Sequence, residues 1–291
     1  MQRTKDWVRQ ALLVPTLRAQ MEVRKLKRGY ATIYAVTCSP TELAELSRIR
    51  SGEIANLAAG IQHYLDTNEE LPRIRVLCFG SCAALENTPQ ELSQWLCNTT
   101  ARGAWLRRLC TAVARFTPAT PIRRIIVHEL THALLDLLTN GFPYPVAIAE
   151  GFARRAEYLL PNKRGMTEWQ QQSSHQQKGH RANLTDDEFM SVRELLCFDA
   201  RARWTSDRAS FLGMTNVSFW LNVYLFKLSG KHPILKRILP ELRLRCITTG
   251  EGVYSWLQEA CSIDHAELED GFYRFCTKGT MELDTTPNDR R

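Results

Sequence analysis

The fold of this 291-residue chain is decided by the segment IRRIIVHELTHALLDLL, residues 122–138. Pro121 precedes this strongly apolar segment and Asn-Gly-Phe-Pro at 140–143 follows it, so signals for the start and the end of a helix flank it. His128 and His132 are four residues apart, and both would project from one face of that helix. Because buried polar groups cost free energy unless something satisfies them, the segment predicts a buried helix that carries a polar site.

The pattern His128-Glu129-x-x-His132 suits a single metal ion. Both imidazoles can bind the ion, while the Glu129 carboxylate is turned toward a metal-bound water rather than toward the metal. Zinc accepts imidazole nitrogen and carboxylate oxygen, and its catalytic sites keep one position for water, whose proton a nearby carboxylate can accept. We therefore expect one Zn²⁺ per chain, with His128 and His132 as ligands and Glu129 as the catalytic base. The alternative is a pair of satisfied core histidines beside a chance glutamate.

A third ligand is expected from the helix predicted at 146–160. Glu150 lies there among small and apolar residues, and a short turn would fold this helix back antiparallel beside the histidines. Glu157 shares the same face two turns later and is a rival ligand, but we favour Glu150; the alternative for Glu150 is a glutamate that stabilises a helix N-terminus. Asp136, one turn after His132, is either an acid that orients this histidine or a surface acid.

Upstream of these helices, the chain alternates β-rich and helical patterns, which predicts a small α/β layer. Its expected elements are a strand at 30–37, one helix from 41 to about 66 with Thr41 as N-cap, a strand at 74–79 and a helix at 88–98. Residues 104–116 fit a strand or a helix equally well.

Downstream, the periodicity is mostly helical, with expected helices at 186–197, 213–229, 232–246, 251–261 and 264–276. The predicted fold class is therefore α+β. The expected organisation is a basic helix or arm at 1–29, an α/β subdomain with the zinc site at 30–160, a polar loop or lid at 161–185, a helical subdomain at 186–279 and a flexible tail at 280–291.

Composition and charge narrow the class of protein. Hydrophobic residues make up 44% and charged residues 24%, which is typical of globular proteins and excludes disordered and collagen-like chains. Nine scattered cysteines predict reduced thiols rather than a disulfide framework. No segment has the length and composition of a membrane helix or a secretory signal, so we expect a cytoplasmic protein. The formal charge of +7 is dispersed along the chain, so we do not expect a nucleic-acid partner.

Two segments, HELTHALLD at 128–136 and PVAIAEGFA at 145–153, resemble the gluzincin branch of the zincin metallopeptidases, and more closely its peptidase MA-like group. The resemblance implies a zincin-like fold of two lobes, a small α/β subdomain with the active-site helix and a mostly helical C-terminal subdomain, with a cleft between them. It implies zinc held by His128, His132 and Glu150, with Glu129 as general base and acid. The implied substrate is a peptide or protein.

The chain also departs from this family. Family members often carry a tyrosine or histidine from the C-terminal half that stabilises the oxyanion, a role for which Tyr224, His175 and His180 are the candidates, although each is better explained as structural or exposed. Some gluzincins place an acidic residue one turn after the third ligand, where it orients a histidine. This chain has Arg154 at that position, so the role is either vacant or falls to Asp136 or Glu157. The leading hypothesis is a zinc metallopeptidase. The alternative is a zincin-fold regulatory or scaffold protein that binds zinc with little or no peptidase activity.

Overall fold

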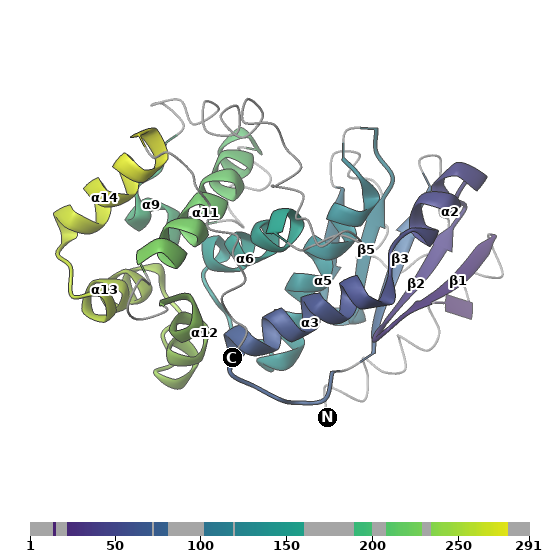
Figure 1. Cartoon of the computed structure of the whole chain (residues 1–291), viewed down its shortest axis with the longest axis horizontal. Helices are drawn as coiled ribbons and strands as arrows, with labels where there is room; N and C mark the ends of the chain where they lie inside the picture. The colour runs from purple at the N-terminus through teal and green to yellow at the C-terminus, as the bar shows by residue number, and fades with distance from the viewer. Residues whose placement is uncertain are drawn as a thin grey trace.

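The computed structural model describes residues 14–15, 22–71, 73–80, 102–118, 120–159, 189–199, 208–228 and 234–278 (Figure 1). The expected helix at 88–98, the polar loop or lid at 161–185 and the tail at 280–291 lie outside these residues.

A mixed sheet forms the N-terminal layer of the described chain. It contains β1 (Val23–Arg28), β2 (Ala31–Val36), β3 (Ile74–Phe79), β4 (Gly103–Leu106) and β5 (Thr111–Arg115), in the order β1-β2-β3-β5-β4. β2, β3 and β5 are parallel, while β1 and β4 pair antiparallel at the two edges. β3 lies in the middle and is almost wholly buried, as its run of apolar residues requires. The strands predicted at 30–37 and 74–79 are confirmed, and the chain is a mixed α/β protein.

The prediction of a basic helix or arm at 1–29 is wrong over Val23–Arg28, which is the edge strand β1. Gly29 has a φ of +58° and occupies the first position of a two-residue connection to β2, where hairpins favour glycine. Leu26 packs against the core while the basic side chains of β1 are mostly exposed, so the strand is amphipathic in spite of its charge.

The single helix predicted from 41 to 66 is two helices, α2 (Pro40–Ser47) and α3 (Ser51–Leu65). The N-cap is Ser39 rather than Thr41: the Glu42 amide donates to Ser39 Oγ at 3.3 Å, and the Ser39 amide donates to the Glu42 carboxylate at 2.7 Å. The helical structure is interrupted between α2 and α3. There Arg28 Nε donates to the Ile49 carbonyl at 2.6 Å, so this carbonyl is bonded to a side chain of β1. Residues 104–116 are mostly strand, since β4 and β5 are joined there by a short 3₁₀ turn at Arg107–Leu109.

Two helices follow as predicted: α5 (Ile122–Leu138) and α6 (Val146–Leu159). The described C-terminal part is also helical, with α9 (Val192–Leu196), α11 (Arg208–Leu228), α12 (Ile234–Leu244), α13 (Gly250–Cys261) and α14 (His265–Lys278). None of the described helices combines the length and the apolar composition needed to cross a membrane.

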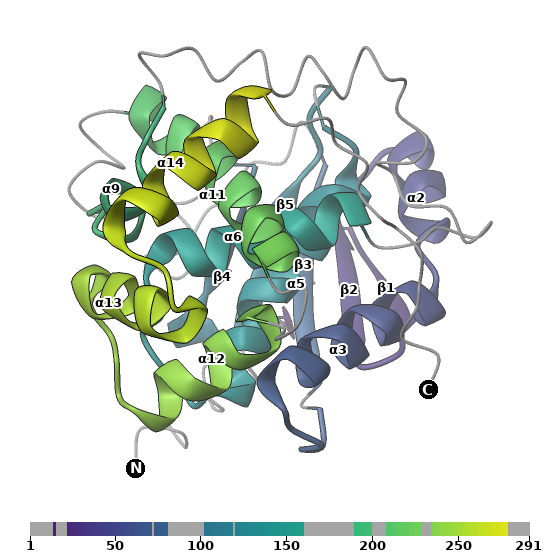
Figure 2. The same ribbon diagram turned by 60° about the vertical axis from the view of Figure 1, so that its left-hand side comes forward.

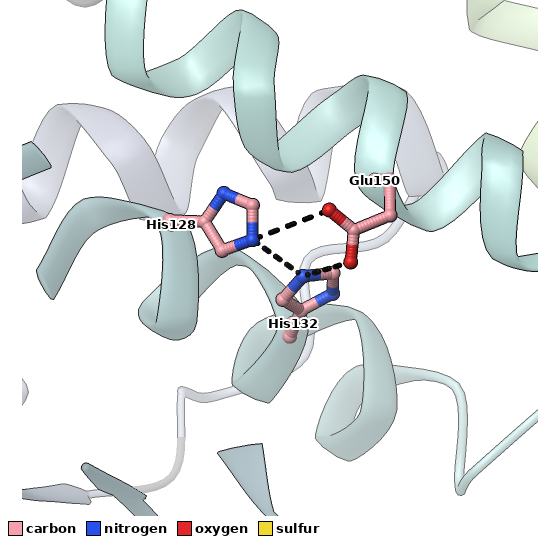
Figure 3. A group of neighbouring side chains, drawn as sticks. All are labelled: His128, His132 and Glu150. Atoms are coloured by element: carbon pink, nitrogen blue, oxygen red, sulfur yellow. Dashed lines mark hydrogen bonds and ion pairs between the residues drawn. The ribbon is translucent and has the colours of Figure 1, made fainter. Parts of the chain in front are cut away.

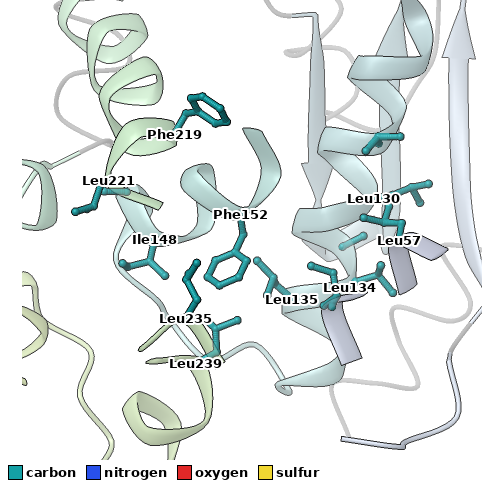
Figure 4. Packing of buried hydrophobic residues seen from close by; sticks show 14 of the residues in the cluster. Leu57, Leu130, Leu134, Leu135, Ile148, Phe152, Phe219, Leu221, Leu235 and Leu239 are labelled. Atoms are coloured by element: carbon teal, nitrogen blue, oxygen red, sulfur yellow. The ribbon is translucent and has the colours of Figure 1, made fainter. Parts of the chain in front are cut away.

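α5 lies between the sheet and the C-terminal helices (Figures 1 and 2). Figure 4 shows Leu130 and Leu134 of α5 on the side of Leu57 of α3, and Leu135 beside Phe152 of α6. All five side chains are at most 3% exposed. Because α5 is apolar on both sides, it joins the sheet layer and the helical layer into one core.

α6 and α11 approach each other closely at Gly151. A Cβ atom on this residue would lie 2.7 Å from the Ser218 carbonyl oxygen and 3.2 Å from Asn222 Cβ, both on α11. Glycine therefore allows a helix contact next to Glu150 that a larger residue would prevent.

The substitution Gly151→Ala is expected to lower the free energy of unfolding by about 1–3 kcal/mol, because the added methyl group overpacks the interface between α6 and α11. The matched control is Gly60→Ala in α3, where a Cβ atom would meet nothing within 4 Å. There the higher helix propensity of alanine should raise the free energy of unfolding by about 0.5–1 kcal/mol. Urea denaturation measures both, and a stabilising effect of Gly151→Ala would contradict the close contact.

Candidate metal centre

His128 and His132 from α5 and Glu150 from α6 converge at one point (Figure 3). The Nε2 atoms of the two histidines are 3.0 Å apart. Glu150 places Oε2 at 3.4 Å from His128 Nε2 and Oε1 at 3.3 Å from His132 Nε2. The three side chains are 12–19% exposed, so the cluster is largely buried but open on one side.

These separations are in the range of ligands that share one metal ion, and Glu150 turns a different oxygen toward each ring. With bonds of about 2.0–2.1 Å to nitrogen and oxygen, neighbouring ligands of a tetrahedral zinc ion are about 3.3–3.4 Å apart. The donors are two imidazoles and one carboxylate, which leaves a fourth position for water. The three side chains could therefore hold a metal ion, and their donor types suit zinc.

The turn between the helices brings Glu150 to the histidines. Asn140 and Gly141 both have positive φ, and the Gly141 amide donates to the Asp136 carbonyl at 2.7 Å, which ends α5 and reverses the chain. Pro145 then precedes α6. The predicted antiparallel return of the second helix is confirmed.

Glu157 lies behind His128 rather than at the convergence point. Its Oε1 is 2.7 Å from His128 Nδ1, and its carboxylate also faces Arg154 at 3.4 Å and Arg124 at 3.8 Å. A carboxylate that accepts a hydrogen bond from Nδ1–H keeps the proton of the neutral ring there and leaves the Nε2 lone pair for a metal. Of the two rival glutamates, Glu150 therefore lies where the histidines converge, and Glu157 contacts the other ring nitrogen of His128.

The electrostatics of the cluster favour a positive charge. Burial alone would lower the pKa of His128, but the carboxylates of Glu150 and Glu157 raise it to about 10. Burial would raise the pKa of Glu150, but His128 and His132 hold it well below its usual range. Without a metal, a proton on His128 thus supplies the charge that a cation would supply in its place.

Asp136 makes its contacts away from the histidines. Its Oδ2 accepts a hydrogen bond from Trp105 Nε1 at 3.0 Å, and its Oδ1 pairs with Arg107 Nε at 3.1 Å. Arg107 also donates to the Gly141 carbonyl at 3.1 Å. Asp136 therefore ties β4 to the C-terminal end of α5, and these partners match neither of the two alternatives considered for it, an acid that orients His132 or a surface acid.

Glu129 borders the same cavity, of about 550 Å³, that His128, His132 and Glu150 line. Its side chain is buried, and burial raises its pKa while the neighbouring histidines oppose this shift. Gly103 at the start of β4 makes room for it, since a Cβ atom there would lie 2.6 Å from Glu129 Oε1. The sequence does not predict this role of Gly103. The residues that follow it, 104–116, fit a strand or a helix equally well, so the position of Gly103 relative to Glu129 could not be inferred.

Of the three residues considered as oxyanion donors, only Tyr224 belongs to the described part of the chain, and it is not at the cavity. Tyr224 of α11 packs its ring against Phe272 and Phe275 of α14, with centroid distances of 5.5 and 5.4 Å, and does not line the cavity. His175 and His180 lie outside the described residues. Arg154 and Thr215 do line the cavity, and Arg154 Nη2 donates to Thr215 Oγ1 at 3.3 Å.

Substitution of Glu157 by glutamine is expected to weaken zinc binding by roughly 10–100-fold, because His128 loses the carboxylate that fixes its tautomer and orientation. Asp136→Asn is the matched comparison and should weaken zinc binding much less, since Asp136 contacts Trp105 and Arg107. Competition with a chromogenic chelator measures both affinities. Equal weakening by the two substitutions would show that Glu157 has no special relation to the site.

Comparison with known proteins does not indicate a family or a function for this chain. No family model matches the chain, and no curated protein is significantly similar to it in sequence.

Proposed function

We propose that this chain is a zinc-dependent metallopeptidase, in which Glu129 is the general base for hydrolysis of the peptide bond. The observation that carries the proposal is the convergence of two imidazoles and one carboxylate at distances of 3.0–3.4 Å. Glu129 borders the same cavity without being one of the three ligands. A site that only binds metal has no need of this fourth residue, whereas hydrolysis needs a base beside the attacking water.

The residues around the cavity have distinct roles in this proposal. Zinc bound by His128, His132 and Glu150 would polarise the substrate carbonyl and lower the pKa of a bound water to about 7. The Glu129 carboxylate would accept a proton from the attacking water and return it to the amine nitrogen of the departing half of the peptide. Glu157 would keep the His128 ring in its binding orientation throughout.

Strand β4 supports a peptide as the substrate. It is one of the two edge strands of the described sheet, and its residues Gly103, Ala104 and Trp105 line the cavity. An extended peptide could pair its main chain with such an edge and pass over the cluster.

The proposed function goes with a zincin-like fold of two lobes. Residues 30–160 would form the α/β subdomain and residues 186–279 the helical subdomain.

One observation favours a zincin-fold scaffold that binds zinc but has little peptidase activity. Tyr224, the tyrosine predicted for the oxyanion, packs against α14, and Tyr144, which lines the cavity, donates its hydroxyl to the Leu239 carbonyl at 3.2 Å. A peptidase would then have to stabilise the oxyanion with another donor at the cavity, such as Arg154.

The comparison of the wild type with Glu129→Gln separates these two functions. The wild type should bind about one zinc per chain, measured by plasma mass spectrometry, and should cleave unfolded proteins or peptide libraries. Glu129→Gln should retain the zinc and lose at least about 100-fold in cleavage rate, since glutamine cannot accept the proton. His132→Ala should lose the zinc itself. Zinc binding with equally inert wild type and Glu129→Gln on every peptide would instead support the scaffold.

A further inference from the structure

The cavity ends in an apolar wall at the C-terminal end of α5. Three segments that are distant in sequence form this wall: Trp105 of β4, Leu135 of α5, and Phe142 and Tyr144 of the turn before α6. The three aromatic side chains are only partly buried although they pack against the core. They therefore present carbon surface to the cavity next to His132.

The polar atoms of this wall already have hydrogen-bond partners. Trp105 Nε1 donates to the Asp136 carboxylate at 3.0 Å, and the Tyr144 hydroxyl donates to the Leu239 carbonyl at 3.2 Å. Asp136 is in turn paired with Arg107 at 3.1 Å, so its charge is compensated. What the wall offers to a ligand is consequently mainly the faces and edges of rings, with the paired Asp136 carboxylate beside them.

The wall is also held in place before any ligand arrives. The rings of Phe142 and Tyr144 meet edge to face with centroids 4.7 Å apart. Arg107 fixes the start of the turn by its bond to the Gly141 carbonyl, and prolines follow at positions 143 and 145. A preformed apolar surface binds with a smaller loss of conformational entropy than one that must first be ordered.

The opposite end of the cavity has a different character. Arg154, Glu157 and Thr215 line it, and all three carry polar or charged groups. α5 and α6 are antiparallel, so the late residues of α6 lie beside the early residues of α5, near His128. The two histidines thus separate an apolar end from a charged end, and a substrate placed across the cluster meets both.

We propose that the apolar wall is the main specificity subsite, and that it takes the side chain of a large apolar residue, aromatic or leucine-like, next to the cleaved bond. This inference rests on the proposed peptidase function. Leu135 lies one turn beyond His132 along α5, so a side chain seated against this wall belongs to a residue close to the reacting carbonyl. Burial of a large apolar side chain supplies the discrimination, because its free energy grows with the apolar area removed from water.

The test uses the full zinc-loaded chain and a set of glycine-rich peptides that differ at one position, with phenylalanine, leucine, alanine or aspartate there. In the wild type, kcat/KM for the phenylalanine or leucine peptide should exceed that for the alanine peptide by about tenfold or more. Mass spectrometry of the products should place the apolar residue at the same position relative to the cleaved bond in every peptide. Cleavage at positions unrelated to the apolar residue would overturn the subsite.

The variant Phe142→Ala should reduce the ratio between the phenylalanine and alanine peptides by about fivefold or more, because part of the wall is removed. Phe142→Leu should preserve most of the ratio, since it keeps an apolar side chain of similar volume. The matched control is Phe226→Ala: Phe226 is 41% exposed on α11 beneath the Arg155 guanidinium and outside the cavity. This control should leave the ratio unchanged. An equal fall of both kcat/KM values in Phe142→Ala, with the ratio intact, would refute the subsite.

Binding to the zinc-loaded Glu129→Gln chain provides a second measurement that does not depend on cleavage. The phenylalanine peptide should bind about tenfold more tightly than the alanine peptide, by calorimetry, and this difference should shrink in the double variant with Phe142→Ala. Failure of the peptidase function would appear as an inert wild type that still shows this binding preference. Equal affinity for both peptides would reject the apolar wall as a subsite whether or not the chain cleaves peptides.

Discussion

One imidazole ring held between two carboxylates fixes how the helices of the site lie together. His128 Nδ1 is 2.7 Å from Glu157, and His128 Nε2 is 3.4 Å from Glu150. The two glutamates are seven residues apart on α6, or about 10 Å along a helix axis, so α6 has to pass close along the His128 face of α5 for both to reach the ring. A buried carboxylate or imidazolium without such a partner would lower the free energy of unfolding by several kcal/mol. The apolar side chains around α5 therefore have to pack in a way that preserves the contacts of His128 with both glutamates.

The elements that could be predicted from the sequence are those encoded locally. The long apolar segment at 122–138, with its terminating Asn-Gly, gave α5, and the short connection gave the antiparallel α6. The spacing of His128 and His132 and the apolar surroundings of Glu150 were enough to predict that the three would meet, which they do. Local signals were sufficient here because one turn joins all the residues concerned.

Features that depend on pairing between distant segments could not be predicted in the same way. β1 carries several basic residues, and only its hydrogen bonds to β2 make it a strand. β4 comes to the site because it pairs with β5 and because Trp105 reaches Asp136. The same bond explains why Asp136, although well spaced for His132, is engaged elsewhere, while Glu157 reaches His128 from the other helix. Sequence spacing identifies residues that share a face but does not say which partner each one takes.

The lack of a side chain at Gly103 affects the position of Glu129 separately from the cluster of His128, His132 and Glu150. A methyl group there would come within 2.6 Å of the Glu129 carboxylate and 2.8 Å of Ile125, and none of its three nearest neighbours belongs to the metal-binding trio. One position on the edge strand can thus displace the proposed base while the histidines and Glu150 stay intact. Under the proposed function, one small substitution outside the helix that carries the motif would turn a peptidase into a protein that binds zinc without cleaving peptides.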